Sequence, residues 1–391
     1  MSSVVIDLRT KVIPPSLQIW RLFPGSGYVF LPAFEKQGVV FLDFPGLDLP
    51  VGPVGEGVAD LEERIMVSRA VREWAWSAAK ASREKRDPPP APSRKLADYV
   101  DATTPRGMAV DKGSIAGLFG RPAKGDLVVV PGTIPSREVR VGEFLDDPET
   151  RVSVKIDRYG EEPIPARRVR WFPAINELEL PERVSEVIRR PNPFVSFDKT
   201  QYTEIFDRTF GTYVYGDQHT ARFDTKSAHF RGNDNLDLML LAEAIASLVE
   251  LSETGGSGAQ ANHLWQLAVR PKSAAFKTDL SININSPGSF LFKSVSLVPL
   301  VFAALFAVSS NGSFAADIPT SVTVINSAST PETDLCTPKV DERVRSALQL
   351  MQIEVWRDAC QRSVRLRQQP EMVGQSRVAP SQTPIVPPHR P

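Results

Sequence analysis

The sequence predicts an α+β protein: a small, partly closed β-barrel with helices, followed by a single transmembrane helix and a short C-terminal helical region. Three observations carry this prediction. Residues 114–172 contain short runs in which apolar and charged residues alternate, which is typical of strands buried on one face. Residues 59–86 contain neither Gly nor Pro and have apolar residues at near-helical spacing. Residues 294–316 contain no charged residue.

Composition limits the classes of function without choosing one. The chain of 391 residues is long enough for two domains, and its 42% of apolar residues can form a core. Lys and Arg (46) balance Asp and Glu (46), so the net charge indicates no partner of either sign. The two Cys and four His have no ligand spacing that favours structural zinc. We therefore expect neither a metal nor another cofactor.

The first half of the chain alternates between strands and helices. Residues 17–44 form a β-rich opening with Pro-Gly turns, and residues 59–86 form a helix of several turns. The run Asp87-Pro-Pro-Pro ends this helix, because proline lacks a backbone donor and clashes with the preceding turn. The strands within 114–172 then pack as a small, partly closed barrel. Two short helices follow, at 181–190 and 199–210.

A flexible linker at 254–261 marks the main domain boundary, because it is rich in Gly and Ser. The region before it, 1–253, is interpreted as a cytoplasmic sensing region. This region contains the barrel at about 17–210 and a helical part at 211–253. Residues 262–293 form a β segment in front of the uncharged run.

The uncharged run 294–316 is long enough for a transmembrane helix, since a bilayer needs about 20 predominantly apolar residues. Basic residues precede the run and acidic residues follow it. The positive-inside rule therefore places residues 1–293 in the cytoplasm and the C-terminal part outside the inner membrane. Small residues in the run, such as Ala303 and Ala304, allow helices to approach closely, so we expect a homo-oligomer.

Two other interpretations of this run stay open. It can be a buried core helix, because Pro299 and the polar residues from Ser309 onward limit a helix to about 15 residues. It can also be an internal signal-like sequence, since Lys293 precedes the apolar run and Ser313-Phe-Ala resembles a cleavage site.

Beyond the run, residues 317–369 are expected to form an outer segment with a helix at about 340–368. Cys336 and Cys360 would then lie in an oxidising compartment that permits a disulfide between them. The Pro-rich tail 370–391 is disordered by composition.

Motifs for catalysis are limited to one weak pattern. Asp217, Asp224 and Lys226 form an Asp/Lys grouping of the kind with which a metal-dependent nuclease binds Mg²⁺ and positions water. A second acidic ligand at a usable spacing is missing, so a solvated loop is the favoured explanation. His219 and His229 flank the grouping and are interpreted as surface or capping residues. We therefore expect no enzymatic activity, with a nuclease as the less favoured interpretation.

A basic strand gives the better binding signal. In the strand 167–172, Arg168 and Arg170 point to one face together with an aromatic residue, while Trp171 points to the other face. Cations beside aromatic rings suit phosphate contacts combined with base stacking. An ordinary half-buried strand whose Arg residues pair with Glu is the alternative. The candidate ligand-binding residues are Trp20, Arg21, Lys155, Arg158, Arg168, Arg170 and Trp171.

Several short blocks of the first half carry a family resemblance. The blocks are Trp20-Arg-Leu-Phe-Pro-Gly, Gly38-Val-Val-Phe-Leu-Asp-Phe, Gly125-Asp-Leu-Val-Val-Val-Pro-Gly, Val141-Gly-Glu-Phe, Tyr159-Gly and Arg168-Val-Arg-Trp. Over about 17–210 the chain resembles the N-terminal module of Mrr-type restriction proteins, which is similar to EVE and PUA-like domains. The resemblance implies a small barrel that binds nucleic acid or modified bases. The nuclease domain of those proteins has no counterpart in the sequence that follows.

A nucleic-acid-sensing module joined to a membrane helix resembles the membrane effectors of bacterial antiphage systems, such as the Hailong type. This architecture implies an effector in which a nucleotide-derived or single-stranded nucleic-acid signal gates an oligomeric assembly that permeabilises the membrane. The implied partners are this ligand, the lipid bilayer, further copies of the chain and a signal-producing nucleotidyltransferase. The alternative is a soluble nucleic-acid-binding module of a restriction or modification system, with 294–316 buried in a second domain.

Overall fold

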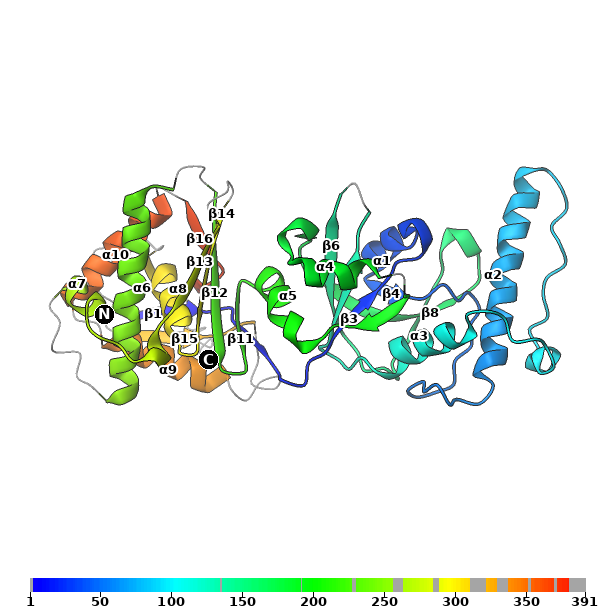
Figure 1. Ribbon diagram of the computed structural model, residues 1–391, viewed down its shortest axis with the longest axis horizontal. Coiled ribbons are helices and arrows are strands. Elements are labelled where there is room, and N and C mark those ends of the chain that lie inside the picture. Colours follow the sequence, from blue (N-terminus) through cyan, green and yellow to red (C-terminus); the bar gives the residue numbers. More distant parts are fainter. Residues whose placement is uncertain are drawn as a thin grey trace, which may run out of the picture. The chain divides into compact units, whose positions relative to one another are not determined.

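The computed structural model forms two compact units, and Figure 1 labels many of their elements. Unit 1 consists of Met1–Pro15 and Phe210–Pro391, and unit 2 consists of Ser16–Thr209. Residues 211–253 thus belong to unit 1, and most of the linker expected at 254–261 lies outside the described residues. The described residues are 3–133, 136–190, 192–226, 230–255, 263–283, 288–309, 321–328, 337–350, 353–368 and 371–379.

Unit 2 is built on an eight-stranded sheet with the strand order β10-β3-β5-β6-β8-β4, in which β7 also pairs with β8 and β9 with β6. β3 and β5 are parallel, and the other neighbours are antiparallel. The strands are β3 (Ile19–Leu22), β4 (Val39–Phe41), β5 (Leu127–Pro131), β6 (Glu138–Phe144), β7 (Val152–Val154), β8 (Ile164–Trp171), β9 (Ile175–Asn176) and β10 (Phe194–Ser196). Among the described residues no pairing joins β10 to β4, so the sheet is not closed into a full barrel.

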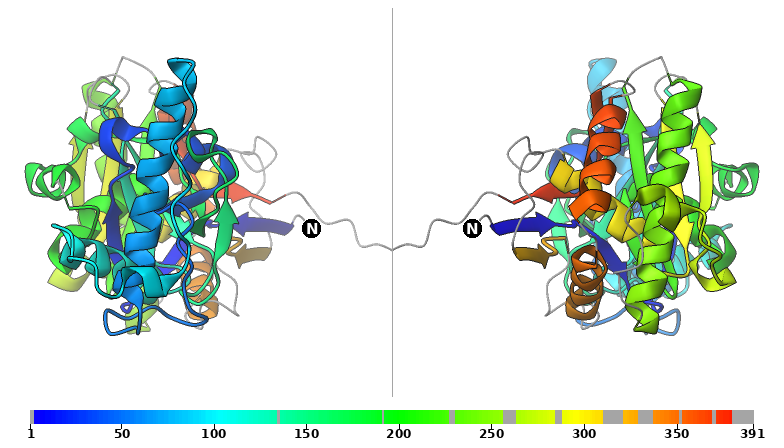
Figure 2. Two further views of the ribbon diagram at one scale, coloured as in Figure 1. Left: turned by 90° about the vertical axis from the view of Figure 1, so that its right-hand side faces the viewer. Right: turned by 90° about the vertical axis from the view of Figure 1, so that its left-hand side faces the viewer.

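The longest helix of unit 2 is α2 (Leu61–Arg83), close to the helix expected at 59–86. Its first half buries Leu61, Ile65 and Val71 in the core, and its second half is largely exposed. Figure 2 shows α2 running along the outside of the unit. The other helices of the unit are α1 (Leu31–Gln37), α3 (Met108–Gly120), α4 (Glu182–Arg189) and α5 (Tyr202–Thr209), with short 3₁₀ turns η1 (Ser26–Tyr28), η2 (Leu96–Tyr99), η3 (Asp157–Tyr159), η4 (Glu177–Glu179) and η5 (Lys199–Gln201).

Unit 1 combines two sheets with a helical layer. One sheet has the order β13-β14-β12-β11-β2, with β16 also paired to β12, and the other has the order β15-β1-β17. The strands are β1 (Ser3–Asp7), β2 (Lys11–Ile13), β11 (Thr212–Tyr215), β12 (Gln218–Thr225), β13 (Asp279–Asn283), β14 (Gly288–Ser294), β15 (Ser321–Ile325), β16 (Met372–Gly374) and β17 (Arg377–Val378). The helices are α6 (Gly232–Thr254), α7 (Leu264–Ala268), α8 (Val298–Ser309), α9 (Thr337–Gln349) and α10 (Ile353–Gln368), with the 3₁₀ turn η7 (Ala274–Phe276).

The predicted transmembrane helix is wrong, because the uncharged run forms the core of unit 1. Its helical part, α8, is 12 residues long, and every one of them is buried. α8 contacts α6, α9 and α10 as well as β1 and β12. A helix that is apolar all round needs an apolar environment, which neighbouring protein supplies here. Among the described residues, none of the helices combines the length and the apolar composition that a bilayer crossing requires. Residues 310–320 lie outside the described part of the chain.

Strand pairing also contradicts the predicted two-sided topology. β1 pairs in parallel with β15, from Ser3 with Ser321 to Asp7 with Ile325. Segments that were expected on opposite sides of a membrane therefore share one sheet. The tail is ordered over β16 and β17, since β16 pairs with β12 and β17 with β1. Residues 380–391 lie outside the described part.

The C-terminal helical region differs from its prediction in two further details. The single helix expected at 340–368 is two helices, α9 and α10. Cys360, on α10, is a buried free thiol, and burial raises its pKa to about 11. Cys336, its expected disulfide partner, lies outside the described residues.

Candidate functional site

The predicted alternation of the basic strand is confirmed along β8. Arg167 and Val169 are buried, whereas the side chains of Arg168 and Arg170 are 51% and 61% exposed. Both exposed guanidinium groups have carboxylate partners. Arg168 forms a bidentate pair with Asp146, with both N to O distances 2.7 Å.

Arg170 and Trp171 at the end of β8 are also bonded within the fold. Arg170 Nη2 lies 2.6 Å from Glu143 Oε2. Trp171 Nε1 donates to the carbonyl of Phe34 at 3.0 Å, so its polar edge is engaged by α1. The β8 face is therefore exposed, but its charges are already compensated by acidic neighbours.

Trp20 and Arg21 on β3 are core residues rather than surface residues. Trp20 is 7% exposed, stacks on Phe194 with ring centroids 5.2 Å apart, and directs Nε1 to Asp126 Oδ2 at 3.3 Å. Arg21 is fully buried and donates to the carbonyls of Val187 and Asn192. Neither side chain has a surface on which a base can stack directly.

The buried charge of Arg21 has an incomplete set of partners. Its Nη2 is buried without a hydrogen-bond partner, and no carboxylate pairs with the guanidinium in the described part of the chain. Burial, and to a smaller degree the charge of Arg190, lowers the pKa of Arg21 to about 10, so it stays cationic at neutral pH. The guanidinium carbon lies 5.6 Å from the centroid of the Phe23 ring. A positive charge is therefore fixed in the core directly behind Phe23.

Phe23 lines a pocket of unit 2, here called the aromatic pocket, with a volume of about 400 Å³. It is lined by Phe23, Tyr28, Pro131, Gly132, Arg137, Glu177, Ile188 and Arg189. The rings of Phe23 and Tyr28 lie 5.3 Å apart at an interplanar angle of 49°, and both are partly exposed. Arg137 is exposed, and no described carboxylate pairs with it, while Arg189 Nε binds Glu177 Oε1 at 2.7 Å.

Two residues of this pocket have an unusual backbone conformation. Six non-glycine residues of the described chain have positive φ, and two of them, Tyr28 (φ 60°) and Arg137 (φ 46°), line the aromatic pocket. Such conformations are strained for residues with a Cβ and tend to gather at functional sites. The Tyr28 turn is held by its N–H, which donates to the carbonyl of Gly25 at 2.9 Å. The backbone that carries the Tyr28 ring is thus held in a strained turn.

The second pocket, here called the lysine pocket, has a volume of about 310 Å³ and contains two of the predicted residues, Lys155 and Arg158. Its lining residues are Val29, Phe30, Pro32, Ala33, Lys36, Gln37, Lys155, Ile156, Asp157 and Arg158. Lys155 forms an ion pair with the exposed Glu161. The Arg158 guanidinium carbon lies 4.9 Å from the centroid of the Trp76 ring.

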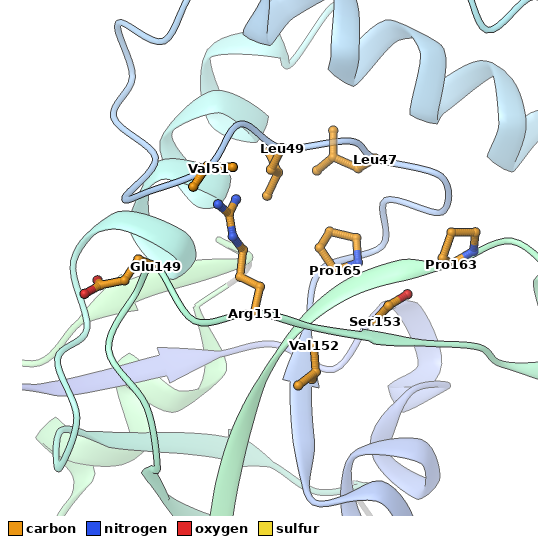
Figure 3. A pocket seen from close by; sticks show the side chains of 9 residues that line it. All are labelled: Leu47, Leu49, Val51, Glu149, Arg151, Val152, Ser153, Pro163 and Pro165. Atoms are coloured by element: carbon orange, nitrogen blue, oxygen red, sulfur yellow. The ribbon is translucent and has the colours of Figure 1, made fainter.

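The third pocket, shown in Figure 3, has a volume of about 360 Å³, and most of its lining residues are Leu, Val or Pro. Its lining residues are Leu47, Leu49, Val51, Glu149, Arg151, Val152, Ser153, Pro163 and Pro165. Its one cation, Arg151, points toward the segment that carries Leu49 and Val51 (Figure 3) and donates Nη2 to the carbonyls of Pro50 and Gly52. The cation therefore holds a loop, and this pocket suits a phosphate less well than the other two.

The structure does not bring together the residues of the weak nuclease pattern. Asp217 precedes β12, whereas Asp224 lies near its end and Lys226 just beyond it. Seven steps of extended strand place the Cα atoms of Asp217 and Asp224 about 23 Å apart, too far for their carboxylates to share a metal ion. Asp224 pairs with Arg222 at 2.8 Å, and the described residues contain no group of three or more potential metal ligands. His219 is buried rather than on the surface, and His229 lies outside the described residues.

Sequence reasoning missed Phe23, Tyr28, Arg137 and Lys36. The run Pro24-Gly25-Ser26-Gly27 after β3 indicated a tight turn before Tyr28. Two glycines with positive φ (77° and 67°) shape this turn. No local pattern could place Arg137 beside that turn. Comparison with known proteins adds no relative: no family model matches the chain, and neither a curated protein nor a solved structure matches it.

Proposed function

We propose that unit 2 binds a nucleotide or single-stranded nucleic acid, with the aromatic pocket holding one base and a neighbouring phosphate. The observation that carries this proposal is the combination of Phe23 and Tyr28 in one pocket with Arg137, for which the described residues supply no carboxylate partner. Its volume of about 400 Å³ lies within the range of small-molecule sites. The resemblance of residues 17–210 to a nucleic-acid-binding module also supports it.

The aromatic rings account for recognition of the base. Both rings are partly exposed, and their mutual contact restrains the Tyr28 side chain, so less side-chain entropy is lost when a base stacks on it. Stacking of a base on an aromatic side chain contributes about 1–3 kcal/mol and accepts any base. We therefore propose recognition with little sequence preference.

Charge accounts for recognition of the phosphate. A guanidinium presents several donors in one plane and suits phosphate oxygens. Arg137 offers this group without a competing carboxylate among the described residues, and Arg21 adds a fixed positive charge behind Phe23. Glu177 is the one acidic side chain in the lining, and it is already paired with Arg189.

Fluorescence anisotropy with labelled single-stranded octamers and with a labelled nucleotide tests the proposal. Tyr28→Asn removes the ring but keeps a residue that tolerates positive φ, and we expect about tenfold weaker binding. Arg137→Ala is expected to weaken binding and to reduce the slope of log K against log salt by about 0.7, because one phosphate contact is lost. Arg121→Ala is the matched control, since Arg121 is an exposed Arg that lines none of the three pockets.

A double Arg168→Ala, Arg170→Ala variant separates the aromatic pocket from the β8 face. We expect it to retain most of the affinity, because both side chains are held by carboxylates. Loss of binding in this variant, together with full binding by Tyr28→Asn and Arg137→Ala, would move the site to β8. An unaltered chain that binds no octamer and no nucleotide would refute the proposed function.

A further inference from the structure

The lysine pocket lies next to the aromatic pocket along the chain. Tyr28 lines the aromatic pocket, and the next two residues, Val29 and Phe30, line the lysine pocket. Consecutive Cα atoms are about 3.8 Å apart. The three residues Tyr28, Val29 and Phe30 therefore form a short segment that separates the two sites. Phe30 is 2% exposed and packs on Phe41 with centroids 5.2 Å apart, which anchors this segment in the core.

We infer that the lysine pocket is a second subsite that binds the phosphate backbone of the same nucleic-acid strand, so that the ligand is a single-stranded oligonucleotide rather than a mononucleotide. This inference rests on the proposed function of the aromatic pocket. It deepens that function by naming the ligand class and the path that the strand follows, from one side of the Tyr28–Phe30 segment to the other.

The charges of the lysine pocket fit a phosphate backbone. Lys36, Lys155 and Arg158 line it, against one carboxylate, that of Asp157. Lys36 is exposed, and among the described residues it has no ion pair. The partner of Lys155 is Glu161, whose side chain is 91% exposed, and such a surface pair contributes only about 0–1 kcal/mol. A phosphate can therefore replace Glu161 at little cost.

Trp76 is not part of the pocket lining, but it holds one of the lining residues, Arg158. It is 46% exposed, and the Arg158 guanidinium lies over its ring. Stacking of the guanidinium holds the arginine at the pocket while its N–H groups stay able to donate. The lysine pocket thus has an aromatic ring behind one of its cations, which suits a protein that holds successive nucleotides.

The test compares ligand lengths in the full chain. The probes are labelled thymidine monophosphate and uridine monophosphate, and labelled dT8 and U8 oligonucleotides. We expect the octamers to bind at least about tenfold more tightly than the mononucleotides, because only they reach both subsites. Similar affinities for dT8 and U8 are expected if neither the sugar nor the thymine methyl group is read, and a preference for one assigns DNA or RNA as the source of the strand.

A double Lys36→Ala, Lys155→Ala variant tests the second subsite directly. Both side chains are exposed, so the fold should be retained, which the unfolding midpoint checks. We expect octamer binding to weaken at least tenfold and the salt slope to fall by about 1.4, with mononucleotide binding unchanged. Trp76→Leu should also weaken octamer binding alone, and Arg121→Ala should alter neither.

The two proposals fail in different ways. If mononucleotide and octamer bind equally and the double lysine variant keeps full octamer affinity, the second subsite is refuted while the aromatic pocket stands. If the unaltered chain binds no probe at all, the proposed function fails and the second subsite fails with it. A variant that loses mononucleotide and octamer binding equally also overturns the assignment of the lysine pocket to the backbone.

Discussion

The guanidinium of Arg167 lies over the ring of Phe144, with the guanidinium carbon 4.7 Å from the ring centroid, and both residues are fully buried. Arg167 Nη1 donates to the carbonyl of Leu118 at 3.0 Å, and Nη2 donates to the carbonyls of Pro122 and Asp146. One side chain therefore joins β8 to the end of α3 and to the loop after β6. Burial lowers its pKa to about 10, which leaves the charge in place at neutral pH.

Arg167→Met is expected to destabilise unit 2 by about 3 kcal/mol or more. The apolar replacement fills much of the space but leaves three carbonyl groups without their donor, and each loss costs about 1–3 kcal/mol. The neighbouring Arg168→Ala is the matched control, because its pair with Asp146 is exposed and contributes about 0–1 kcal/mol. Hydrogen exchange of β8 peptides measures both changes. Equal protection in the two variants would contradict a structural role for Arg167.

Gly132→Ala is expected to destabilise the turn between β5 and β6. A Cβ at this position would overlap the carbonyl oxygen of Glu138, to which the Gly132 N–H donates at 2.7 Å. The backbone must move, so we expect a loss of about 2 kcal/mol and weaker nucleotide binding, because Gly132 also lines the aromatic pocket. Gly57→Ala provides the control, since its Cβ would meet no atom within 4 Å. Thermal unfolding and anisotropy on both variants check the prediction.

His219 is expected to make the stability of unit 1 depend on pH. It is 7% exposed on β12, and burial, aided by the charge of Arg343, lowers its pKa from 6.5 to about 4, although Asp217 acts in the opposite direction. Above pH 6.5 the imidazole is neutral in both states, and its contribution is fully present. As the pH falls toward 4, the unfolded chain binds a proton that the folded chain does not, so stability is lost.

The loss attributed to His219 is about 2 kcal/mol between pH 7 and pH 5. His219→Gln is neutral at every pH and should show that much less change over the same interval, whatever its stability at pH 7. Hydrogen exchange of β12 and α6 peptides at the two pH values provides the measurement. Parallel pH dependence in both proteins would show that His219 is solvated in the folded state.

Local sequence patterns predicted those helices and strands whose formation depends on neighbouring residues in the chain. The Gly- and Pro-free stretch indicated α2, and alternation placed Arg168 and Arg170 on the exposed face of β8. The pairing of β1 with β15 could not be predicted in this way, because no local pattern in residues 3–7 indicates that residues 321–325 are their partner. The aromatic pocket is a similar case, since Tyr28 and Arg137 meet only after β5 and β6 have paired.

The prediction for the uncharged run was wrong because composition indicates an apolar environment without indicating whether lipid or protein supplies it. Lipid and a protein core both exclude charge, so a helix buried on all sides has the same composition as one that crosses a bilayer. The length of the helix distinguishes the two cases, and Pro299 and Ser309 near the ends of α8 indicated that it is short. Structure shows which partners surround the helix, and these are α6, α9, α10 and the strands of unit 1.

The aromatic contacts of α8 provide a last test of its place in the core. Phe302 stacks on Phe292 with ring centroids 4.6 Å apart and meets the edge of Phe223 at 5.2 Å, which ties the helix to β14 and β12. Phe302→Ala would leave a cavity among rings that cannot close it, so we expect unit 1 to lose about 3–5 kcal/mol. Val295→Ala is the control, because Val295 lies just before α8 and is 56% exposed. Limited proteolysis should cut unit 1 of the Phe302 variant much faster than that of the control, and equal rates would mean that the ring cluster does not hold α8 in the core.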